Sequence, residues 1–489
     1  FPASSVKLEP RSRKLWFNEL AFYDENGARI PASIGTVDGV SSYAHSSPAH
    51  LLDEQDRIPE VGSFMTDMYF DEIYHARTAF EHLNGLAPYE NSHPPLGKIF
   101  IMLGVAVFGM NPLGWRIVGT LFGIGMVPLM YIFGKRLFKK PGYAFLGAFL
   151  FTFDFMHFAQ TRIATIDSYS VFFIIAMLYF MYRFYTTTNY NTQSLKSCLP
   201  PLFLSGLMLG LGIASKWICV YAGLGVAVML LIYLYKRYRE YLYALEEYST
   251  AQGAERMRLV GILTGYKKKT LGLFFLCLLF FIIIPLAIYL ASYLPYRLVV
   301  EGQAYDLSGV WGVQEFMLTY HSGLTAGHPF SSQWWEWPLM FKPIWYYKGA
   351  VEAGKVAAIS SFGNPAVWWA GFVAMLAVGY WAIKGRYKGD SGILLVFVGI
   401  AANFLPWIAV TRATFIYHYF ATVPFMVFAL VYFFKYIEER RPKLVRLRYA
   451  YMAVVLIFFI LYYPLLSGMT VDIGYARFVR TIPAWTIFG

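Results

Sequence analysis

A series of long apolar blocks constrains the fold of this 489-residue chain more than any other feature. A bilayer core roughly 30 Å thick needs about 20 apolar residues in one helix, and blocks such as 270–293 and 449–466 have about that length. Hydrophobic residues make up 57% of the chain and charged residues only 14%, too few to cover a soluble protein of this size. The sequence therefore predicts an all-α protein that crosses a membrane many times.

Ten apolar segments have the length and composition expected of membrane-spanning helices. They lie near residues 113–135, 142–160, 166–185, 200–214, 217–235, 270–294, 365–384, 391–411, 415–435 and 449–467. A further apolar segment, 95–110, is too short to span comfortably, and we expect an interfacial helix there. Two groups of spans are therefore expected, within 113–294 and within 365–468.

The net charge of +12 is concentrated in short loops between the apolar blocks, which is typical of topology signals and gives no reason to expect a nucleic-acid partner. The four basic clusters are Lys135, Arg136, Lys139 and Lys140; Lys236, Arg237 and Arg239 with residues 267–269; Lys384, Arg386 and Lys388; and Arg440, Arg441, Lys443, Arg446 and Arg448. Alternation through ten spans puts all four on one side, which the positive-inside rule makes cytoplasmic. Residues 1–112, the loop 295–364 and the tail 469–489 are then external or lumenal.

The first 65 residues are polar and contain one strand-like stretch, 15–23, followed by a turn at 24–27. This region resembles the end of a discoidin-type β-domain, inserted in the first external loop. The chain begins inside a polar stretch, so we expect further sequence upstream. The only cysteines, Cys198, Cys219 and Cys277, are expected to be small buried hydrophobic residues, because neither disulfide nor metal spacing is present.

The long external loop is rich in Trp and Tyr, notably Trp334, Trp335, Trp337, Trp345, Tyr346 and Tyr347. Such residues suit either a belt at the membrane interface or a platform for a sugar, and composition alone favours the belt.

Placing ionisable residues at the ends of apolar segments costs free energy, and such residues are numerous on the external side. An acidic pair, Asp71 and Glu72, precedes the interfacial helix, and His93 and Lys98 open it. The cations Arg116, Arg162, Lys216 and Arg412, together with Asp167, His328 and His418, mark the outer ends or loops of other segments. Cations at this level can hold a lipid-linked phosphate, and a carboxylate opposite them can accept a proton from a hydroxyl nucleophile.

Each of these residues also has a structural interpretation. The acidic pair can be solvated, Arg116 and Arg412 can be snorkelling anchors, and Arg162 can form an ion pair with Asp167. Lys216 can end a helix, and His93 and His328, which precede prolines, can cap or pack. No tight spacing of metal ligands is present, so we expect no tightly bound cofactor and leave dependence on a divalent cation open. The clustering on one face favours an active site.

Seven ordered segments make the chain similar to protein O-mannosyltransferases, inverting glycosyltransferases with the GT-C fold that use lipid-linked sugars. They are FDEIYHARTAFEHLNG, ENSHPPLGK, WRIVGTLFGIGMVPLMY, RIATIDSYSVFF, GLGIASKWICVYAG, HPFSSQWWEWPLM and RATFIYHYFATVPF, from about residue 66 to the end. The resemblance implies a dolichyl- or polyprenyl-phosphate-mannose donor and a Ser or Thr hydroxyl of a protein as acceptor. It also implies that Asp71 is the base, that Glu72 positions the acceptor, and that Arg116, with Lys216 and Arg412, contacts the donor phosphate.

Two departures from the family pattern matter. The family has a span before the acidic pair, which would bring the count to eleven, and its eukaryotic members carry a β-trefoil region for which 295–364 is too short. The first departure leads us to expect that the sequence is truncated upstream. The second suggests a bacterial homologue in the plasma membrane that uses a polyprenyl carrier, and family members often form dimers. The alternatives are a related transferase acting on a glycan or lipid, and a transporter, for which we find neither an inverted repeat nor polar residues at the membrane centre.

Overall fold

The computed structural model describes residues 5–8, 19–37, 47–58, 61–300, 306–323 and 327–488. The chain divides into two compact units, Phe1–Asp67 and Met68–Gly489.

The first unit contains a small antiparallel hairpin of strands β1 (Phe22–Tyr23) and β2 (Arg29–Ile30), followed by short helical turns η1 (Pro48–Leu51) and η2 (Gln55–Arg57). The predicted turn at 24–27 is confirmed, because Asp24 Oδ1 accepts hydrogen bonds from the backbone N–H groups of Asn26 (2.9 Å) and Ala28 (2.8 Å). Of the strand predicted at 15–23, only its last two residues are a strand; residues 15–18 lie outside the described part. The discoidin-type origin of this unit stays a prediction.

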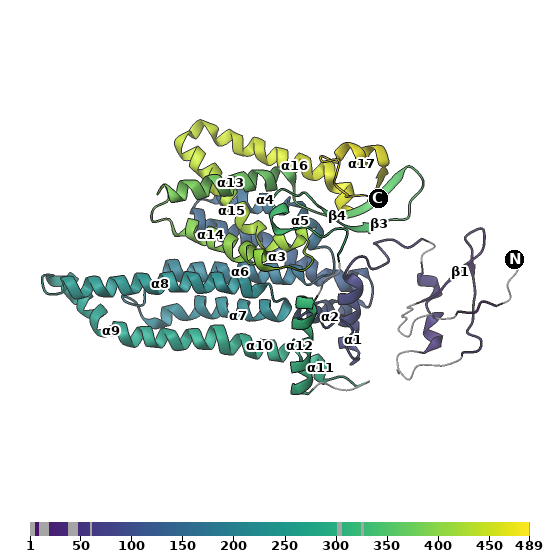
Figure 1. Cartoon of the computed structure of the whole chain (residues 1–489), viewed down its shortest axis with the longest axis horizontal. Helices are drawn as coiled ribbons and strands as arrows, with labels where there is room; N and C mark the ends of the chain where they lie inside the picture. Colours follow the sequence, from purple (N-terminus) through teal and green to yellow (C-terminus); the bar gives the residue numbers. More distant parts are fainter. Residues whose placement is uncertain are drawn as a thin grey trace. The chain divides into compact units, whose positions relative to one another are not determined.

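The second unit is a bundle of helices with one small sheet (Figure 1). Its helices before the long external loop are α1 (Glu72–Leu83), α2 (Leu96–Phe108), α3 (Pro112–Phe138), α4 (Pro141–Thr152), α5 (Phe155–Gln160), α6 (Asp167–Thr187), η3 (Leu195–Cys198), α7 (Leu199–Ser215), α8 (Cys219–Glu247), α9 (Gly253–Leu278), the π-helical η4 (Leu279–Ile283) and α10 (Ile284–Ser292).

The long loop itself folds into α11 (Leu294–Arg297), α12 (Leu307–Gly323), η5 (Trp334–Glu336) and strands β3 (Ile344–Lys348) and β4 (Lys355–Ser361). The chain continues through α13 (Pro365–Ile383), α14 (Ser391–Phe404), η6 (Leu405–Ala409), η7 (Ile416–Ala421), α15 (Val423–Arg440), η8 (Pro442–Leu444), α16 (Val445–Ser467), β5 (Thr470–Asp472) and α17 (Ile473–Val479). The sheet has the antiparallel order β3-β4-β5, so it joins the long loop to the C-terminal tail.

Within the described ranges, eight helices are long and apolar enough to cross a membrane: Pro112–Phe138, Asp167–Thr187, Leu195–Ser215, Cys219–Glu247, Gly253–Ser292, Pro365–Ile383, Ser391–Ala409 and Pro442–Ser467. These correspond to eight of the ten predicted spans. The segment predicted at 142–160 is broken into α4 and α5, because the buried Asp154 starts a new helix there. The segment predicted at 415–435 becomes η7 and α15, whose last two turns are charged and whose first ten residues are all buried in the bundle.

Local sequence explains how the site end of the bundle is built. Asn111 caps α3 by accepting a hydrogen bond from Gly114 N–H (3.0 Å), and Pro112 fits the first helical position because it needs no N–H partner. On α7, a Cβ added to Gly206 would lie 2.1 Å from the carbonyl oxygen of Phe280 in η4, so only glycine allows these helices to approach so closely.

Helices α1, α11 and α12 and the sheet gather at one end of the bundle, and the turn between α8 and α9 lies at the other (Figure 1). Because successive long helical segments run in opposite directions, the connections α3–α4, α8–α9, α13–α14 and α15–α16 all come at the end away from α1. The four basic clusters lie in these connections or in the helices that flank them; Lys236, Arg237, Arg239 and residues 267–269 are in α8 and α9.

Candidate active site

Asp71 occupies the position immediately before α1, where an aspartate normally accepts a hydrogen bond from the first turn. Here it makes no such bond, and its carboxylate accepts no hydrogen bond from any residue that the structure describes. The preceding residue, Phe70, has a positive φ of 53°, which costs a bulky residue about 1–2 kcal/mol. Its ring packs on Tyr346 of β3, with centroids 4.3 Å apart, and this packing holds the strained turn.

Burial and nearby charges shift the pKa of Asp71 into the range in which a carboxylate can act as a base. Burial above all raises the pKa of the Asp71 carboxyl to about 6; the carboxylates of Asp167 and Glu90 add to the rise, and the Lys216 ammonium opposes it. A carboxylate with a pKa near neutrality and an unoccupied acceptor edge can accept a proton from a bound hydroxyl.

Glu72, the other half of the acidic pair, is fully buried and has all its acceptor sites in use. Its carboxylate receives a forked pair of hydrogen bonds from Arg116 (both 2.7 Å) and further bonds from the N–H groups of Ala164 (2.9 Å) and Tyr69 (3.2 Å). It therefore ties α1 to α3 and to the loop after α5. The interpretation of the pair as solvated is wrong for Glu72, and Arg116 is an ion-pair partner and no snorkelling anchor.

Lys216 and Asp167 form a second ion pair, with 2.7 Å between Nζ and Oδ1. Asp167 is the first residue of α6 and Lys216 follows the last residue of α7, so the pair joins two helix ends. The alternative ion pair between Arg162 and Asp167 is therefore wrong. Arg162 instead donates to the Leu466 carbonyl (3.3 Å), and its guanidinium lies 4.7 Å from the ring centroid of Phe158.

Arg412, like Arg162, has most of its hydrogen-bonding capacity unused in the described chain. In the described ranges its guanidinium makes one long hydrogen bond, 3.5 Å to the Ala413 carbonyl, and no ion pair. Its charge acts on Tyr417, as do those of Asp71 and Asp167, so these groups share one electrostatic environment.

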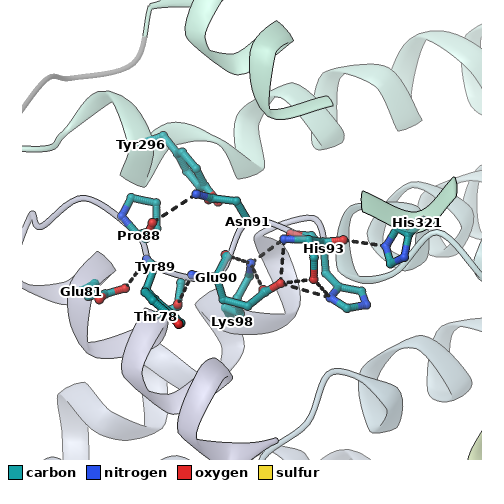
Figure 2. Close-up of polar contacts among 11 residues, drawn as sticks. Thr78, Glu81, Pro88, Tyr89, Glu90, Asn91, His93, Lys98, Tyr296 and His321 are labelled. Atoms are coloured by element: carbon teal, nitrogen blue, oxygen red, sulfur yellow. Dashed lines mark hydrogen bonds and ion pairs between the residues drawn. The ribbon is translucent and has the colours of Figure 1, made fainter. Parts of the chain in front are cut away.

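The three predicted histidines have different settings. Nδ1 of His418 accepts the Phe415 N–H (3.0 Å) and its ring packs on Trp407 at 4.4 Å, so it holds a turn. His328 is exposed and its Nδ1 accepts the Phe330 N–H (3.2 Å), the capping arrangement considered above. His93 lies in a buried polar cluster with Glu90 and Lys98, shown in Figure 2.

The structure thus brings Asp71, Asp167, Lys216 and Arg412 into one environment and pairs Glu72 with Arg116 beside it. The substrate roles expected of Glu72, Arg116, Arg162, His328 and His418 stay predictions. No group of three His, Cys, Asp or Glu residues in the described part of the chain is arranged to hold a metal ion.

Sequence reasoning missed several residues of this site: Phe70, His75, Glu90, His321 and Tyr417. Tyr346 was singled out only as part of the aromatic loop. His75 could have been found, since it follows Asp71 by one helical turn and shares its face of α1. Glu90 opens the motif that contains His93, but its partner Lys98 lies beyond two prolines, where no periodic pattern predicts contact.

Comparison with known proteins agrees with these features. The family model described as dolichyl-phosphate-mannose-protein mannosyltransferase matches residues 107–300, and that described as the C-terminal four-span region of protein O-mannosyltransferase matches 307–485. A Mycobacterium tuberculosis protein named polyprenol-phosphate-mannose–protein mannosyltransferase is 28% identical over 94% of this chain and 95% of its own length. A Corynebacterium glutamicum protein of the same name is 26% identical over 86% of this chain and 84% of its own.

Among solved structures, the protein O-mannosyltransferase complex Pmt1-Pmt2 of S. cerevisiae, bound to the sugar donor, has a TM-score of 0.72 at 12% identity, covering 88% of this chain and 90% of its own. ArnT from Cupriavidus metallidurans, bound to undecaprenyl phosphate, has a TM-score of 0.51 at 12% identity, covering 85% and 69%. These likenesses identify the fold as GT-C. Two family models that together span most of the chain, relatives matched over nearly their full length and a shared fold establish that this chain belongs to the protein O-mannosyltransferase family.

Proposed function

We propose that this protein transfers mannose from a polyprenyl-phosphate-mannose donor to Ser or Thr hydroxyls of proteins, with inversion at the sugar. The observation that carries the proposal is Asp71, a carboxylate with a pKa near 6 that accepts no hydrogen bond in the described chain. The Lys216 charge acts on Asp71 itself, and Arg412 and Asp71 both act on Tyr417. The names of the bacterial relatives support a polyprenol-phosphate-mannose donor and a protein acceptor.

The reaction assigns a task to each group. The acceptor oxygen attacks the anomeric carbon, the bond from that carbon to the phosphate oxygen breaks, and the hydroxyl proton passes to Asp71. The phosphate leaves with the electron pair of the broken bond, and Arg412 and Lys216 stabilise its charge. Glu72 contributes by fixing the start of α1, since its carboxylate is already filled by Arg116 and two backbone N–H groups.

The positive-inside rule supports an extracytoplasmic site in a bacterial plasma membrane, because the basic connections come at the end of the bundle away from α1. Pairing of two copies is part of the proposal, since a structural relative is a two-protein complex. We expect no tightly bound metal; addition of EDTA to the assay below tests for dependence on a divalent cation.

The test incubates membranes containing the wild type or Asp71→Asn with labelled polyprenyl-phosphate mannose and a Ser/Thr peptide, with an Ala-substituted peptide as control. Label should enter only the hydroxyl peptide, and the Asn variant should lose transfer while still binding the donor, because it loses a proton acceptor and little volume. Label found in lipid or glycan but never in peptide would refute the protein acceptor. Full activity of the Asn variant would refute the assignment of Asp71 as the base.

A further inference from the structure

A buried charge pair holds the loop between α1 and α2 in place. Lys98 is fully buried, and its ammonium donates to the Glu90 carboxylate (2.6 Å), the Glu90 carbonyl (2.7 Å) and the His93 carbonyl (3.0 Å). All three N–H bonds of the ammonium are therefore used inside this loop, as Figure 2 shows.

The second oxygen of the Glu90 carboxylate holds His93. It accepts hydrogen bonds from Ser92 N–H (2.7 Å), from the Ser92 hydroxyl, and from His93 Nδ1 at 3.3 Å. Burial alone would raise the pKa of Glu90, but Lys98 and His93 hold it well below its usual range, so the carboxylate is ionised and can only accept. The Ser92 hydroxyl also lies 2.9 Å from Nδ1 of His93, and because its hydrogen goes to Glu90, its oxygen can only accept there. With acceptors on both contacts, Nδ1 of His93 carries a hydrogen.

The other ring nitrogen of His93 is left as an acceptor. Burial lowers the pKa of the imidazole, so the ring is neutral, and with hydrogen on Nδ1 its Nε2 presents a lone pair. Nε2 has no hydrogen-bond partner among the described residues, and 24% of the side chain is exposed. Glu90 thus orients an imidazole whose Nε2 has no partner in the described chain, as a carboxylate orients the base of a catalytic triad.

Two other histidines lie near this imidazole, and one of them is a helical turn after the proposed base. The ring centroid of His93 is 6.1 Å from that of His75, which is one helical turn after Asp71, and 5.2 Å from that of His321 on α12. His321 Nε2 donates to the Ser92 carbonyl (2.8 Å), which closes the loop from the far side (Figure 2). The Lys216 charge acts on His93 and on Asp71 alike.

We propose that Nε2 of His93 accepts a hydrogen bond from a hydroxyl of the bound substrates, and that Glu90 and Lys98 are positioning residues that act through it. The inference rests on the proposed function, which supplies two kinds of hydroxyl, those of the mannose and that of the acceptor residue. A fixed neutral acceptor suits a hydroxyl donor and has no affinity for phosphate, which distinguishes its task from those of Lys216 and Arg412.

The test compares His93→Ala, His93→Gln and the charge-free double variant Glu90→Gln/Lys98→Met, each measured for kcat and for the KM of donor and of peptide. The matched control is Glu81→Gln. Glu81 is also buried and braces the same loop, accepting the Tyr89 N–H (2.6 Å) and Arg77 Nε (2.9 Å), but it does not touch His93 (Figure 2).

His93→Ala should lower kcat/KM about 10- to 100-fold relative to the control, as expected for one lost hydrogen bond in a buried site, with an unchanged unfolding temperature. His93→Gln, whose amide oxygen reaches the position of Nε2, should recover part of the loss. The double variant should resemble His93→Ala, and adding His93→Ala to it should cost nothing more.

The KM values identify the hydroxyl: a rise for the peptide assigns it to the acceptor residue, and a rise for the donor assigns it to mannose. A kcat/KM of His93→Ala equal to that of Glu81→Gln, with the wild type active, would overturn the inference and leave the proposed function standing. Absence of peptide labelling by the wild type would be a failure of the proposed function instead. If the double variant does not fold, the comparison of His93→Ala with Glu81→Gln still tests whether His93 contributes to catalysis.

Discussion

Asp71 and Glu72 are adjacent residues, but the start of α1 gives their carboxylates opposite environments. Phe70, in a left-handed conformation, turns the chain so that Glu72 enters the helix facing Arg116 while Asp71 stays outside the helix with a free acceptor edge. Because both residues are carboxylates, the sequence could indicate the pair. It could not show which carboxylate accepts no hydrogen bond and which is buried in an ion pair.

The raised pKa of Asp71 makes the reaction depend on pH. A base works only when ionised, so kcat/KM should be low below about pH 6 and should rise to a plateau above it. The folded-state pKa also lies above the usual value of 3.8, so stability falls as pH rises from there to about 6 and is then constant. Asp71→Asn, which carries no charge, should therefore unfold at no lower temperature than the wild type at pH 7.5. A rate profile that is flat from pH 5 to 8 would contradict this role.

Arg116→Ala should mainly lower the free energy of unfolding, with a smaller effect on donor binding. It leaves the buried Glu72 carboxylate without its partner, which costs about 3–5 kcal/mol of unfolding free energy. Arg412→Ala is the matched control: Arg412 makes no ion pair in the described chain, so this variant should lose activity at an unchanged unfolding temperature. Thermal unfolding in detergent distinguishes the two variants. If Arg116→Ala is as stable as the wild type and only its donor KM is raised, Arg116 contacts the donor phosphate as first predicted.

At the level of helices, apolar composition located eight long spanning helices, and the two other predicted segments differ from a single long apolar helix. The block 142–160 is apolar enough for one helix, but Asp154 inside it caps α5 and breaks the span. In the same way, the length of 415–435 did not reveal that α15 is surrounded by other helices. Composition reports how apolar a segment is, and cannot report whether lipid or protein covers it.

Asp154→Ala should be among the most destabilising changes in the bundle. The Asp154 carboxylate accepts four hydrogen bonds, from the N–H groups of Met156 (3.1 Å), His157 (3.3 Å) and Asn364 (3.1 Å) and from the indole of Trp368 (2.8 Å). Each buried donor left without a partner costs about 1–3 kcal/mol, so the alanine variant should lose several kcal/mol of stability or fail to accumulate. Asp154→Asn retains one acceptor oxygen and should lose less; equal stability of the alanine variant and the wild type would contradict this account.

For the whole molecule, the sequence predicted the helical fold class and the family correctly, because both depend on residues that are local or ordered along the chain. The contacts that assemble the site are of another kind. Tyr346 in β3 donates its hydroxyl to Gln160 (2.6 Å), and His321 in α12 bonds Ser92, across separations of 186 and 229 residues. No periodic pattern encodes such pairs, so the buried neighbours of Asp71 could be found only from the fold.

The orientation of the whole protein can be tested with two cysteine substitutions. Glu352 in the β3–β4 turn and Thr250 in the α8–α9 turn are both exposed, and they lie at opposite ends of the bundle. The native Cys198 and Cys219 are buried, and Cys277 is half-buried within the span Gly253–Ser292, so none of them should react with a membrane-impermeant maleimide.

In intact cells, Glu352→Cys should be labelled at once, whereas Thr250→Cys should be labelled only after the membrane is made permeable, because the basic α8–α9 connection should face the cytoplasm. The wild-type protein provides the background. Labelling in the reverse order would place Asp71 and its cations on the cytoplasmic side and would overturn the proposed face of action.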